Sequence, residues 1–157
     1  MLKAWRAAGE FCDFQGSRLM RIQLVISKHK VNVISVYAPT YNSDVRIKDQ
    51  FYRDLRAMLQ AIPSSEEVFI LGDFNARVGR NPQDDKHDAV ALSEDIILGP
   101  FGLGHTNDNG ERLLALCESA PVGQLRVMDT FFKHKHYGTW FHNSSRRWYH
   151  IDHVLGR

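Results

Sequence analysis

A carboxylate and a carboxamide follow directly on a short apolar run near the middle of the chain. Residues 68–71 read Val-Phe-Ile-Leu, and Gly72, Asp73, Phe74 and Asn75 come next. Ligands bind at the carboxyl ends of strands in α/β folds. Asp73 can hold a metal ion or take a proton from water, while Asn75 can orient a phosphate oxygen without adding charge. Taken alone, the same residues are more typical of an Asp/Asn turn after a buried strand.

Two further polar side chains stand in segments that are otherwise apolar. Tyr37 is at the end of the β-branched run 31–38, and Asp152 is inside the apolar run 151–155. A buried tyrosine with a satisfied hydroxyl is an ordinary core residue. A buried carboxylate is costly without a partner, so Asp152 needs one.

Hydrophobic periodicity predicts an α/β fold for the segments that carry these residues. Strands are expected over 18–27 and 31–38, joined as an antiparallel hairpin and ended by Pro39, which cannot donate to a sheet ladder. A helix follows, with N-caps available at residues 42–44. Its apolar stripe has helical spacing and comprises Ile47, Phe51, Leu55, Met58, Leu59 and Ile62. With a central strand over 68–71, the order strand-helix-strand indicates an α/β domain.

The second half of the chain begins with a long polar loop. Residues 79–106 are expected to form this loop, with one short element over 90–98. Residues 107–109 can cap a helix over 111–119. The inward-facing residues of that helix are expected to be Leu113, Leu114 and Cys117. Three closing strands are expected over 127–132, 139–142 and 148–155.

Length and composition predict a single globular domain. The 157 residues are 43% hydrophobic and 24% charged, which suits one domain with a real core. Cys12 and Cys117 lie far apart and lack C-x-x-C spacing, as in a reduced protein, although a disulfide between them is possible. Charged residues interrupt the first twelve positions, and no apolar stretch is long enough to cross a membrane. We therefore expect a soluble intracellular protein, nuclear or cytoplasmic.

Charge is distributed unevenly along the chain. Residues 1–80 have a net charge of +4, residues 81–111 of −6 and residues 112–157 of +4. A basic segment with interleaved tryptophans can bind a polyanion such as DNA. Arg146 and Arg147 lie in a predicted turn, where long cations can reach a nucleic-acid backbone. On charge alone, an ordinary solvated surface is the simpler interpretation.

Taken in order, the motifs of this chain resemble the endonuclease domain of non-LTR retrotransposons. The series is VYAPT, a helix, FILGDFNARVG, NDNGERLLALC, DTFF, GTW and IDHVL, and the likeness spans residues 4–157. It is greatest to the RTE-like group and to craniofacial development protein 2-like proteins, within the endonuclease/exonuclease/phosphatase superfamily. The resemblance implies a four-layer α/β sandwich of the DNase I-like type and an endonuclease that cuts DNA with Mg²⁺ or Mn²⁺.

The resemblance also implies roles for individual residues. Asp73 is similar to the family's water-activating carboxylate, and Asn75 to its companion at the metal and the scissile phosphate. Tyr37 matches the tyrosine that contacts the phosphate, and Asp152 matches the aspartate that orients a catalytic histidine. Positions that correspond to the DNA-facing surface are Asn107, Thr139 and Trp140.

Other parts of the family pattern are missing from these 157 residues. The family has an asparagine and a metal-binding glutamate on upstream strands, where this chain has Glu10 in a helix-like stretch, and a downstream Ser-Asp-His motif that this sequence lacks. The resemblance therefore predicts that residues 1–157 form one partial domain, incomplete at both ends. Loss of one member of a catalytic unit can lower the rate by about 10³ to 10⁶. Two functions remain open: a nuclease with weak or no activity, or an inactive relic that binds nucleic acid or protein.

Histidines near the end of the chain offer alternatives. Strand side chains alternate faces, so His150 shares the expected face of Asp152 and is better placed than His153 to replace the missing catalytic histidine. The alternative is that His150 and His153 are ordinary histidines at the surface or at an interface. His134 and His136, on one face of a strand, could hold zinc, although no cysteine or acidic partner lies near them in the sequence.

Overall fold

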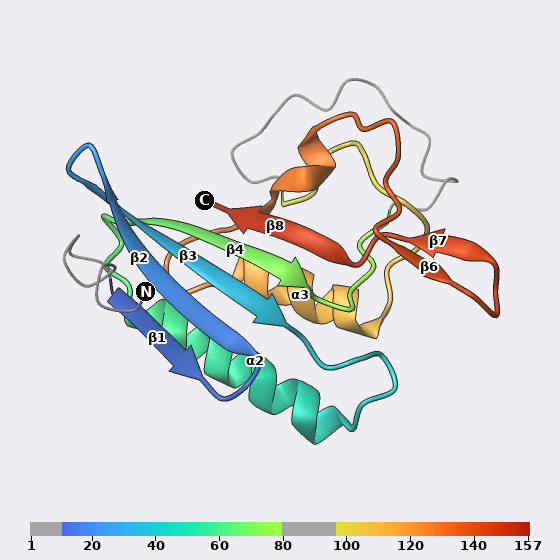
Figure 1. The fold of residues 1–157 in the computed structure, drawn as a ribbon, viewed down its shortest axis with the longest axis horizontal. Coiled ribbons are helices and arrows are strands. Elements are labelled where there is room, and N and C mark those ends of the chain that lie inside the picture. Colours follow the sequence, from blue (N-terminus) through green and yellow to red (C-terminus); the bar gives the residue numbers. More distant parts are fainter. Residues whose placement is uncertain (1–10, 80–96) are drawn as a thin grey trace, which may run out of the picture.

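A six-stranded mixed sheet forms the centre of the molecule (Figure 1). The computed structural model describes residues 11–79 and 97–157. Within them the strand order of the sheet is β1-β2-β3-β4-β8-β5. Its strands are β1 (Phe11–Gln15), β2 (Leu19–Ile26), β3 (His29–Tyr37), β4 (Glu67–Asp73), β5 (Arg126–Val127) and β8 (Asp152–Gly156). A separate hairpin of β6 (Trp140–His142) and β7 (Arg147–Tyr149) projects from one end of the molecule.

The strand-helix-strand unit has the predicted form. Strands β2 and β3 pair antiparallel, and Ser27 and Lys28 between them have positive φ angles of 50° and 75°, as a two-residue hairpin turn requires. Helix α2 (Val45–Gln60) then crosses one face of the sheet, and β4 returns parallel to β3. Because β3 and β4 are parallel, their carboxyl ends meet at the same edge of the sheet.

The α-helices of the described residues, α2 and α3 (Asp108–Glu118), cover the same face of the sheet (Figure 1). Asp44 is the N-cap of α2, since its carboxylate accepts the Arg46 N–H at 2.8 Å. Ile47 was expected in the buried stripe but is 50% exposed, because it lies in the first turn of α2. The core between sheet and helices includes Leu19, Ile34, Val36, Phe51, Leu55, Met58, Leu59, Val68, Ile70, Leu113, Leu116, Cys117 and Leu155.

Helix α3 buries a face slightly different from the expected one. Leu113, Leu116 and Cys117 are fully or almost fully buried, whereas Leu114 is only partly buried. Positions three and four residues apart share one side of a helix, so Leu116 and not Leu114 continues the stripe that begins at Leu113. No helix in the described part of the chain is long and apolar enough to span a membrane.

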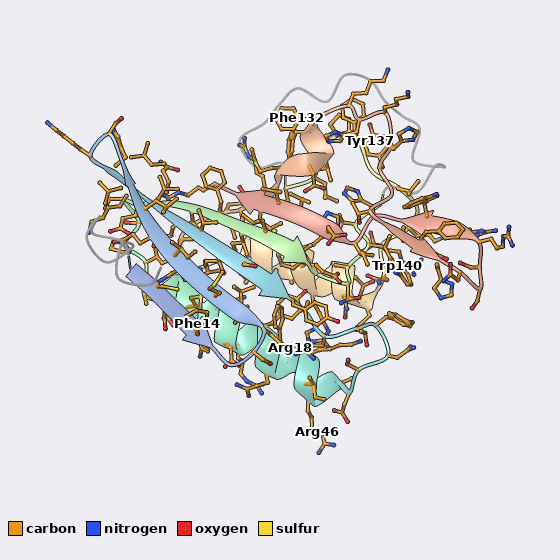
Figure 2. The ribbon with its side chains drawn as sticks, in the orientation of Figure 1. Phe14, Arg18, Arg46, Phe132, Tyr137 and Trp140 are labelled. Carbon is orange, nitrogen blue, oxygen red and sulfur yellow. The ribbon has the colours of Figure 1, made fainter. Side chains whose placement is uncertain are left out.

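The opposite face of the sheet exposes apolar side chains. Phe69, Leu71 and Val154 are between 36% and 39% exposed, and Phe14, on the edge strand, is 66% exposed (Figure 2). These residues lie on the face away from the helices, since Leu71 pairs with Val154 and alternates with the buried Ile70. Of the four layers expected, the described residues therefore supply one sheet and one layer of helices.

Three strands differ from the expectation. The strand expected over 127–132 is two residues long, because Met128–Phe131 form a 3-10 helix (η2) in which the Thr130 hydroxyl donates to the Val127 carbonyl. The strand expected over 148–155 is divided into β7 and β8. Part of the stretch predicted as helix-like forms β1, which pairs with β2. Most of the short element expected over 90–98 lies outside the described residues.

We predict that Leu55→Ala lowers the free energy of unfolding by about 2–5 kcal/mol, because truncation of a fully buried leucine leaves a cavity. Ile47→Ala on the same helix is the control and should change stability by less than about 0.5 kcal/mol. Urea denaturation measures both, with the m-value serving as a check on compactness. Equal losses in the two variants would contradict the assignment of the buried face of α2.

Candidate functional site

Tyr37, Asp73 and Asp152 lie in one row across three neighbouring strands. The parallel register places Tyr37 of β3 beside Asp73 of β4, and the antiparallel register places Asp73 opposite Asp152 of β8. Paired positions point to the same face of a sheet, so these polar groups share the face away from the helices. The two carboxylates are half-buried and Tyr37 is exposed. Three residues from well-separated segments are thus brought together.

Asn75 lies in a tight backbone turn two residues beyond β4. Its φ angle is 47°, a left-handed conformation that asparagine tolerates better than most residues. The Asn75 N–H donates to Asp73 Oδ1 at 2.8 Å, and Asn75 Nδ2 donates to the Ala38 carbonyl at 2.9 Å. The side-chain amide is therefore fixed in orientation, with its donor end directed at the backbone after β3 and its acceptor oxygen turned away from it.

The polar and apolar alternation of β4 continues through this turn. Phe74, Ala76 and Val78 are buried, whereas Asn75 and Arg77 are only partly buried. Arg77 is thus a site residue that the sequence interpretation missed, although its period-two spacing from Asp73 was a usable signal.

The start of α3 fixes the carbonyl side of the same turn. Asn107 is the N-cap: its Oδ1 accepts the N–H groups of Gly110 and Arg77 at 2.8 and 2.9 Å, and its Nδ2 donates to the Asn75 carbonyl at 3.3 Å. Asn109 Nδ2 donates to the same carbonyl at 3.1 Å. A side chain at Gly110 would overlap the Arg77 carbonyl oxygen, so only glycine allows this approach. Asn107 was expected on a DNA-facing surface; its hydrogen bonds position the turn, and its side chain also lines a cavity next to the turn.

Buried Lys48 connects the loop after β3 to the start of α3. Its ammonium donates to the Tyr41 carbonyl at 2.7 Å and to Asp108 Oδ2 at 2.9 Å, and it lies 5.3 Å from the centroid of the Tyr41 ring. A buried ammonium is stable only with such partners. The contacts hold Tyr41 on the side of the turn where a cavity opens.

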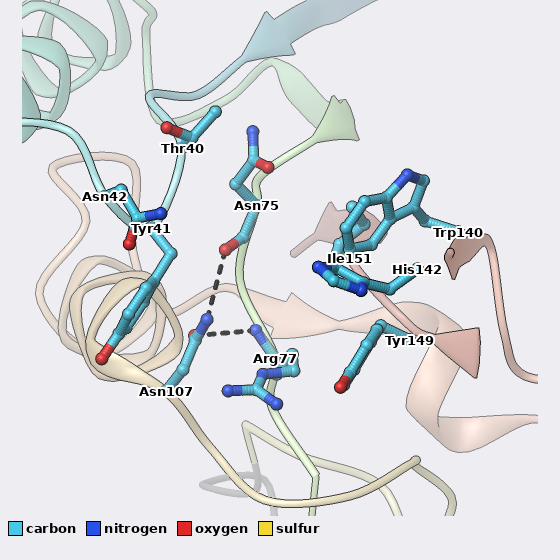
Figure 3. Close-up of a pocket in the computed structure, with 10 residues that line it drawn as sticks. All are labelled: Thr40, Tyr41, Asn42, Asn75, Arg77, Asn107, Trp140, His142, Tyr149 and Ile151. Carbon is cyan, nitrogen blue, oxygen red and sulfur yellow. Dashed lines mark hydrogen bonds between the residues drawn. The ribbon is translucent and has the colours of Figure 1, made fainter. Parts of the chain in front are cut away.

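A cavity of about 360 Å³ lies beside Asn75 (Figure 3). Aromatic rings form much of its wall, and the Arg77 guanidinium stands over the Tyr149 ring at 5.1 Å from the centroid. Aromatic faces stack nucleic-acid bases, and arginine contacts phosphates, so this lining can accept a nucleotide. The residues that line the cavity are Thr40, Tyr41, Asn42, Asn75, Arg77, Asn107, Trp140, His142, Tyr149 and Ile151.

The remaining predicted DNA contacts lie on or next to the β6–β7 hairpin. Trp140 lines the cavity and is 46% exposed, and Arg146 and Arg147 are exposed at the turn of the hairpin and the start of β7. Thr139 Oγ1 accepts the N–H groups of Ile151 and Asp152, both at 3.2 Å. Thr139 therefore positions the segment that carries Asp152.

The carboxylates of the row are electrostatically coupled. Burial raises the pKa of Asp73, the Asn75 N–H opposes this effect, and the negative charge of Asp152 adds to the increase. A cation held beside Asp73 would relieve the repulsion. The Asp73 carboxylate and the Asn75 amide oxygen are hard oxygen donors of the kind that Mg²⁺ and Mn²⁺ prefer, with Asp152 on the next strand. The donor set therefore fits a divalent cation.

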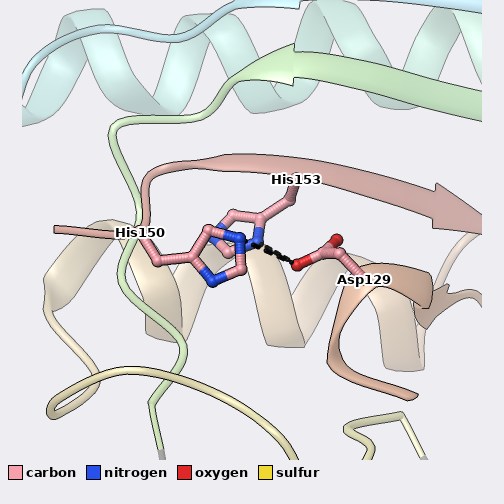
Figure 4. Close-up of side chains that lie close together, drawn as sticks. All are labelled: Asp129, His150 and His153. Atoms are coloured by element: carbon pink, nitrogen blue, oxygen red, sulfur yellow. Dashed lines mark hydrogen bonds and ion pairs between the residues drawn. The ribbon is translucent and has the colours of Figure 1, made fainter. Parts of the chain in front are cut away.

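His150 and His153 are both buried, so neither is the surface histidine considered above (Figure 4). His153 pairs with Gly72 and points away from the face of Asp152, as alternation predicts. His150 was expected on the face of Asp152, but its ring lies 4.6 Å from that of His153 and its Nε2 lies 3.2 Å from Asp129 Oδ2. The expectation was wrong because β7 ends at Tyr149 and β8 begins at Asp152, so strand alternation does not extend back to His150.

Burial and neighbouring charges shift the pKa values of His150 and Asp129. Burial and the neighbouring His153 lower the pKa of His150. Burial raises the pKa of Asp129, but its contacts with His153 and the Val154 N–H outweigh that effect and leave it lowered. His134 and His136 lie in an irregular segment between η2 and β6, and not on a strand face as expected.

Comparison with solved structures identifies the fold. The chain matches an endonuclease/exonuclease/phosphatase family protein from Leptotrichia buccalis with a TM-score of 0.51 and 13% identity, over 88% of this chain and 40% of that one. It matches the endonuclease domain of TRAS1, a telomere-specific non-LTR retrotransposon, with a TM-score of 0.55 and 10% identity, over 93% of this chain and 53% of that one. The expected α/β fold of the endonuclease/exonuclease/phosphatase, DNase I-like type is therefore confirmed.

Sequence comparison gives a more specific likeness. The chain is 30% identical over 150 residues to craniofacial development protein 2 of Bos taurus and 29% identical to that of Tragulus javanicus. These alignments cover 93% of this chain, which spans 23% of the length of each relative. The expected resemblance to craniofacial development protein 2-like proteins is confirmed. No protein-family model matches the chain.

We predict that Asp73→Asn raises the thermal unfolding midpoint at neutral pH. A carboxyl whose pKa is raised by folding is most favourable when protonated, so its ionisation costs stability as pH rises through the folded pKa. Asparagine keeps the oxygen that accepts the Asn75 N–H and removes the charge. The gain should shrink below the unfolded pKa, where wild-type Asp73 is protonated. Asp54→Asn on α2 is the control, and a lower midpoint for Asp73→Asn at pH 7 would contradict the argument.

Proposed function

We propose that residues 1–157 are part of one metal-dependent phosphodiesterase domain of retrotransposon origin that acts on DNA. The observation that carries the proposal is the row of Tyr37, Asp73 and Asp152 beside the fixed amide of Asn75. Phosphodiester hydrolysis needs a group that activates water, ligands for a cation and groups that hold the phosphate, and the row with Asn75 contains candidates for each. The structural likeness to the endonuclease domain of TRAS1 and the sequence likeness to craniofacial development protein 2 support a phosphodiesterase of this kind.

Asp73 and Asn75 would hold the Mg²⁺ or Mn²⁺ ion. When bound, such a cation polarises the phosphoryl oxygen and stabilises the leaving oxygen. Asp73 accepts a proton from the attacking water. The Tyr37 hydroxyl donates to a phosphate oxygen.

Asp152 takes the role that the resemblance assigns to it, the orientation of a catalytic histidine. Neither His150 nor His153 shares its face of the sheet, so neither is that histidine. The 157 residues contain no Ser-Asp-His sequence. We therefore expect the chain by itself to have weak or no nuclease activity.

DNA is the proposed ligand of the cavity and of the hairpin. Trp140 and Tyr149 offer faces on which a base can stack, and Arg77 is close enough to contact the attached phosphate. Arg146 and Arg147 extend the cationic surface along the hairpin. An intracellular location, nuclear or cytoplasmic, is part of the proposal, and the free thiols of Cys12 and Cys117 are consistent with it.

The second candidate function is binding without catalysis. The specific observation in its favour is that no histidine of the described residues lies in the row with Asp73 and Asp152. The aromatic cavity and the basic hairpin do not depend on a complete catalytic unit, so an inactive chain would keep them and would bind nucleic acid or another protein.

Nicking of supercoiled plasmid in Mg²⁺ tests catalysis. If wild type nicks, Asp73→Ala should abolish nicking and Asn75→Ala should nearly do so, because each removes a donor to the cation. Asp54→Ala, which removes a carboxylate from α2 away from the row, should nick like wild type. Full activity of Asp73→Ala would overturn the proposed site. Absence of nicking in wild type, together with DNA binding, would favour the second candidate.

Salt dependence of binding tests the hairpin. Arg146→Ala/Arg147→Ala should weaken the binding of a fluorescent duplex uniformly across sequences and lower the slope of log affinity against log salt by up to about two units, one per lost phosphate contact. Lys28→Ala/Lys30→Ala removes the same charge from the β2–β3 turn at the far end of the sheet (Figure 1) and should leave the slope unchanged. Equal slopes in all three proteins would show that the arginines only face solvent.

A further inference from the structure

Asp129, His150 and His153 lie close together (Figure 4), and His153 points to the side of the sheet opposite to the row of carboxylates. They come from η2, from the link between β7 and β8, and from β8 itself. His153 Nδ1 lies 2.9 Å and His150 Nε2 lies 3.2 Å from Asp129 Oδ2. The side chains are 0%, 8% and 15% exposed for His153, His150 and Asp129.

The hydrogen bonds around His153 place two acceptor atoms, His153 Nδ1 and Asp129 Oδ2, opposite each other. His153 Nε2 lies 2.9 Å from the Ala76 carbonyl oxygen, which can only accept, so Nε2 carries the hydrogen. In a neutral ring the lone pair is then on Nδ1, which faces Asp129 Oδ2, another acceptor. Asp129 Oδ1 already accepts the Val154 N–H at 2.8 Å. The contact between Nδ1 and Oδ2 therefore needs either a proton, carried by His153 or by Asp129, or a metal ion between the two atoms.

The geometry matches that of a zinc site. Ligand atoms at tetrahedral zinc stand about 3.3 Å apart, given bonds of about 2.0–2.1 Å. All three ligand atoms of the cluster lie within 4.8 Å of one another, and Asp129 Oδ2 lies 2.9 and 3.2 Å from the two nitrogens, close to the ideal separation. A ligating histidine commonly donates its other N–H to a backbone carbonyl, as His153 does to Ala76. Two imidazole nitrogens suit zinc and not Mg²⁺, which prefers oxygen.

We propose that Asp129, His150 and His153 bind one Zn²⁺ ion, with water as the fourth ligand. The ion would join η2 to both ends of the segment 150–153. That segment carries Ile151, which lines the cavity, and Asp152, which lies in the carboxylate row. The zinc site would therefore be structural, and its occupancy would hold the neighbouring functional residues in place.

Cobalt and zinc titrations of the full chain test the proposal. The chain is stripped with EDTA and dialysed, and excess Mg²⁺ is present throughout to saturate the oxygen site at Asp73. Co²⁺, used as a spectroscopic probe of the zinc site, should bind with one equivalent and give the visible absorption of a four-coordinate ion with nitrogen ligands. Zn²⁺ should displace it and raise the unfolding midpoint. None of these readouts depends on nuclease activity.

Variants decide which residues hold the ion. His150→Gln and Asp129→Asn keep polarity and approximate shape, and each should lower Co²⁺ affinity at least tenfold and abolish the zinc-dependent rise of the midpoint. The control His134→Gln/His136→Gln removes the other histidine pair and should bind like wild type. Failure of the wild-type chain to bind Co²⁺ or Zn²⁺ would assign a proton, and not a metal ion, to the contact between His153 and Asp129. Binding that survives both cluster substitutions, or that is lost in the control, would equally overturn the proposal.

Discussion

The backbone turn at Asn75 is the constraint on which the rest of the site depends. Its left-handed conformation is stabilised from three directions: Asp73 accepts its N–H, Ala38 accepts its side-chain amide, and Asn107 and Asn109 donate to its carbonyl. Each of these hydrogen bonds pairs a partly buried polar group of Asn75, which would cost free energy if it were left without a partner. The end of β4, the loop after β3 and the start of α3 are therefore locked together at one residue.

This lock explains why the site needs the two helices as well as the sheet. Asp108 binds the buried Lys48 of α2, and Arg112 of α3 forms an ion pair with Asp49 of α2, so the helix that provides Asn107 and Asn109 is itself held in register. The loop that carries Tyr41 is attached to the same lysine. The cavity is thus a consequence of how α2 and α3 pack, and its shape is set by buried polar contacts as well as by apolar packing.

Much of the fold and part of the site could be predicted from the sequence. The β2–β3 hairpin, α2 and β4 were predicted because apolar period, caps and prolines agree locally over each segment. The division between β7 and β8 could not be predicted, because Trp148 to Leu155 is rich in β-prone residues and has no Gly or Pro to mark a break, so the pairing partners decide where the strand ends. Because one continuous strand was expected, His150 was wrongly placed on the face of Asp152. Nothing in the local sequence around Tyr41 or Ile151 indicates that they line the cavity. The alternation of Asp73, Asn75 and Arg77 with apolar residues, in contrast, does indicate that Arg77 faces the site.

Strand β8 links the two proposed sites of the molecule. Asp152 points to the carboxylate row and His153, the next residue, points to the cluster with Asp129, because successive side chains of a strand face opposite sides. The Ile151 carbonyl accepts the Phe74 N–H at 3.0 Å, which attaches the start of this strand to the turn at Asn75. A shift of β8 by one residue would exchange the two faces and destroy both sites at once. The register of one short strand against β4 therefore determines whether either site exists.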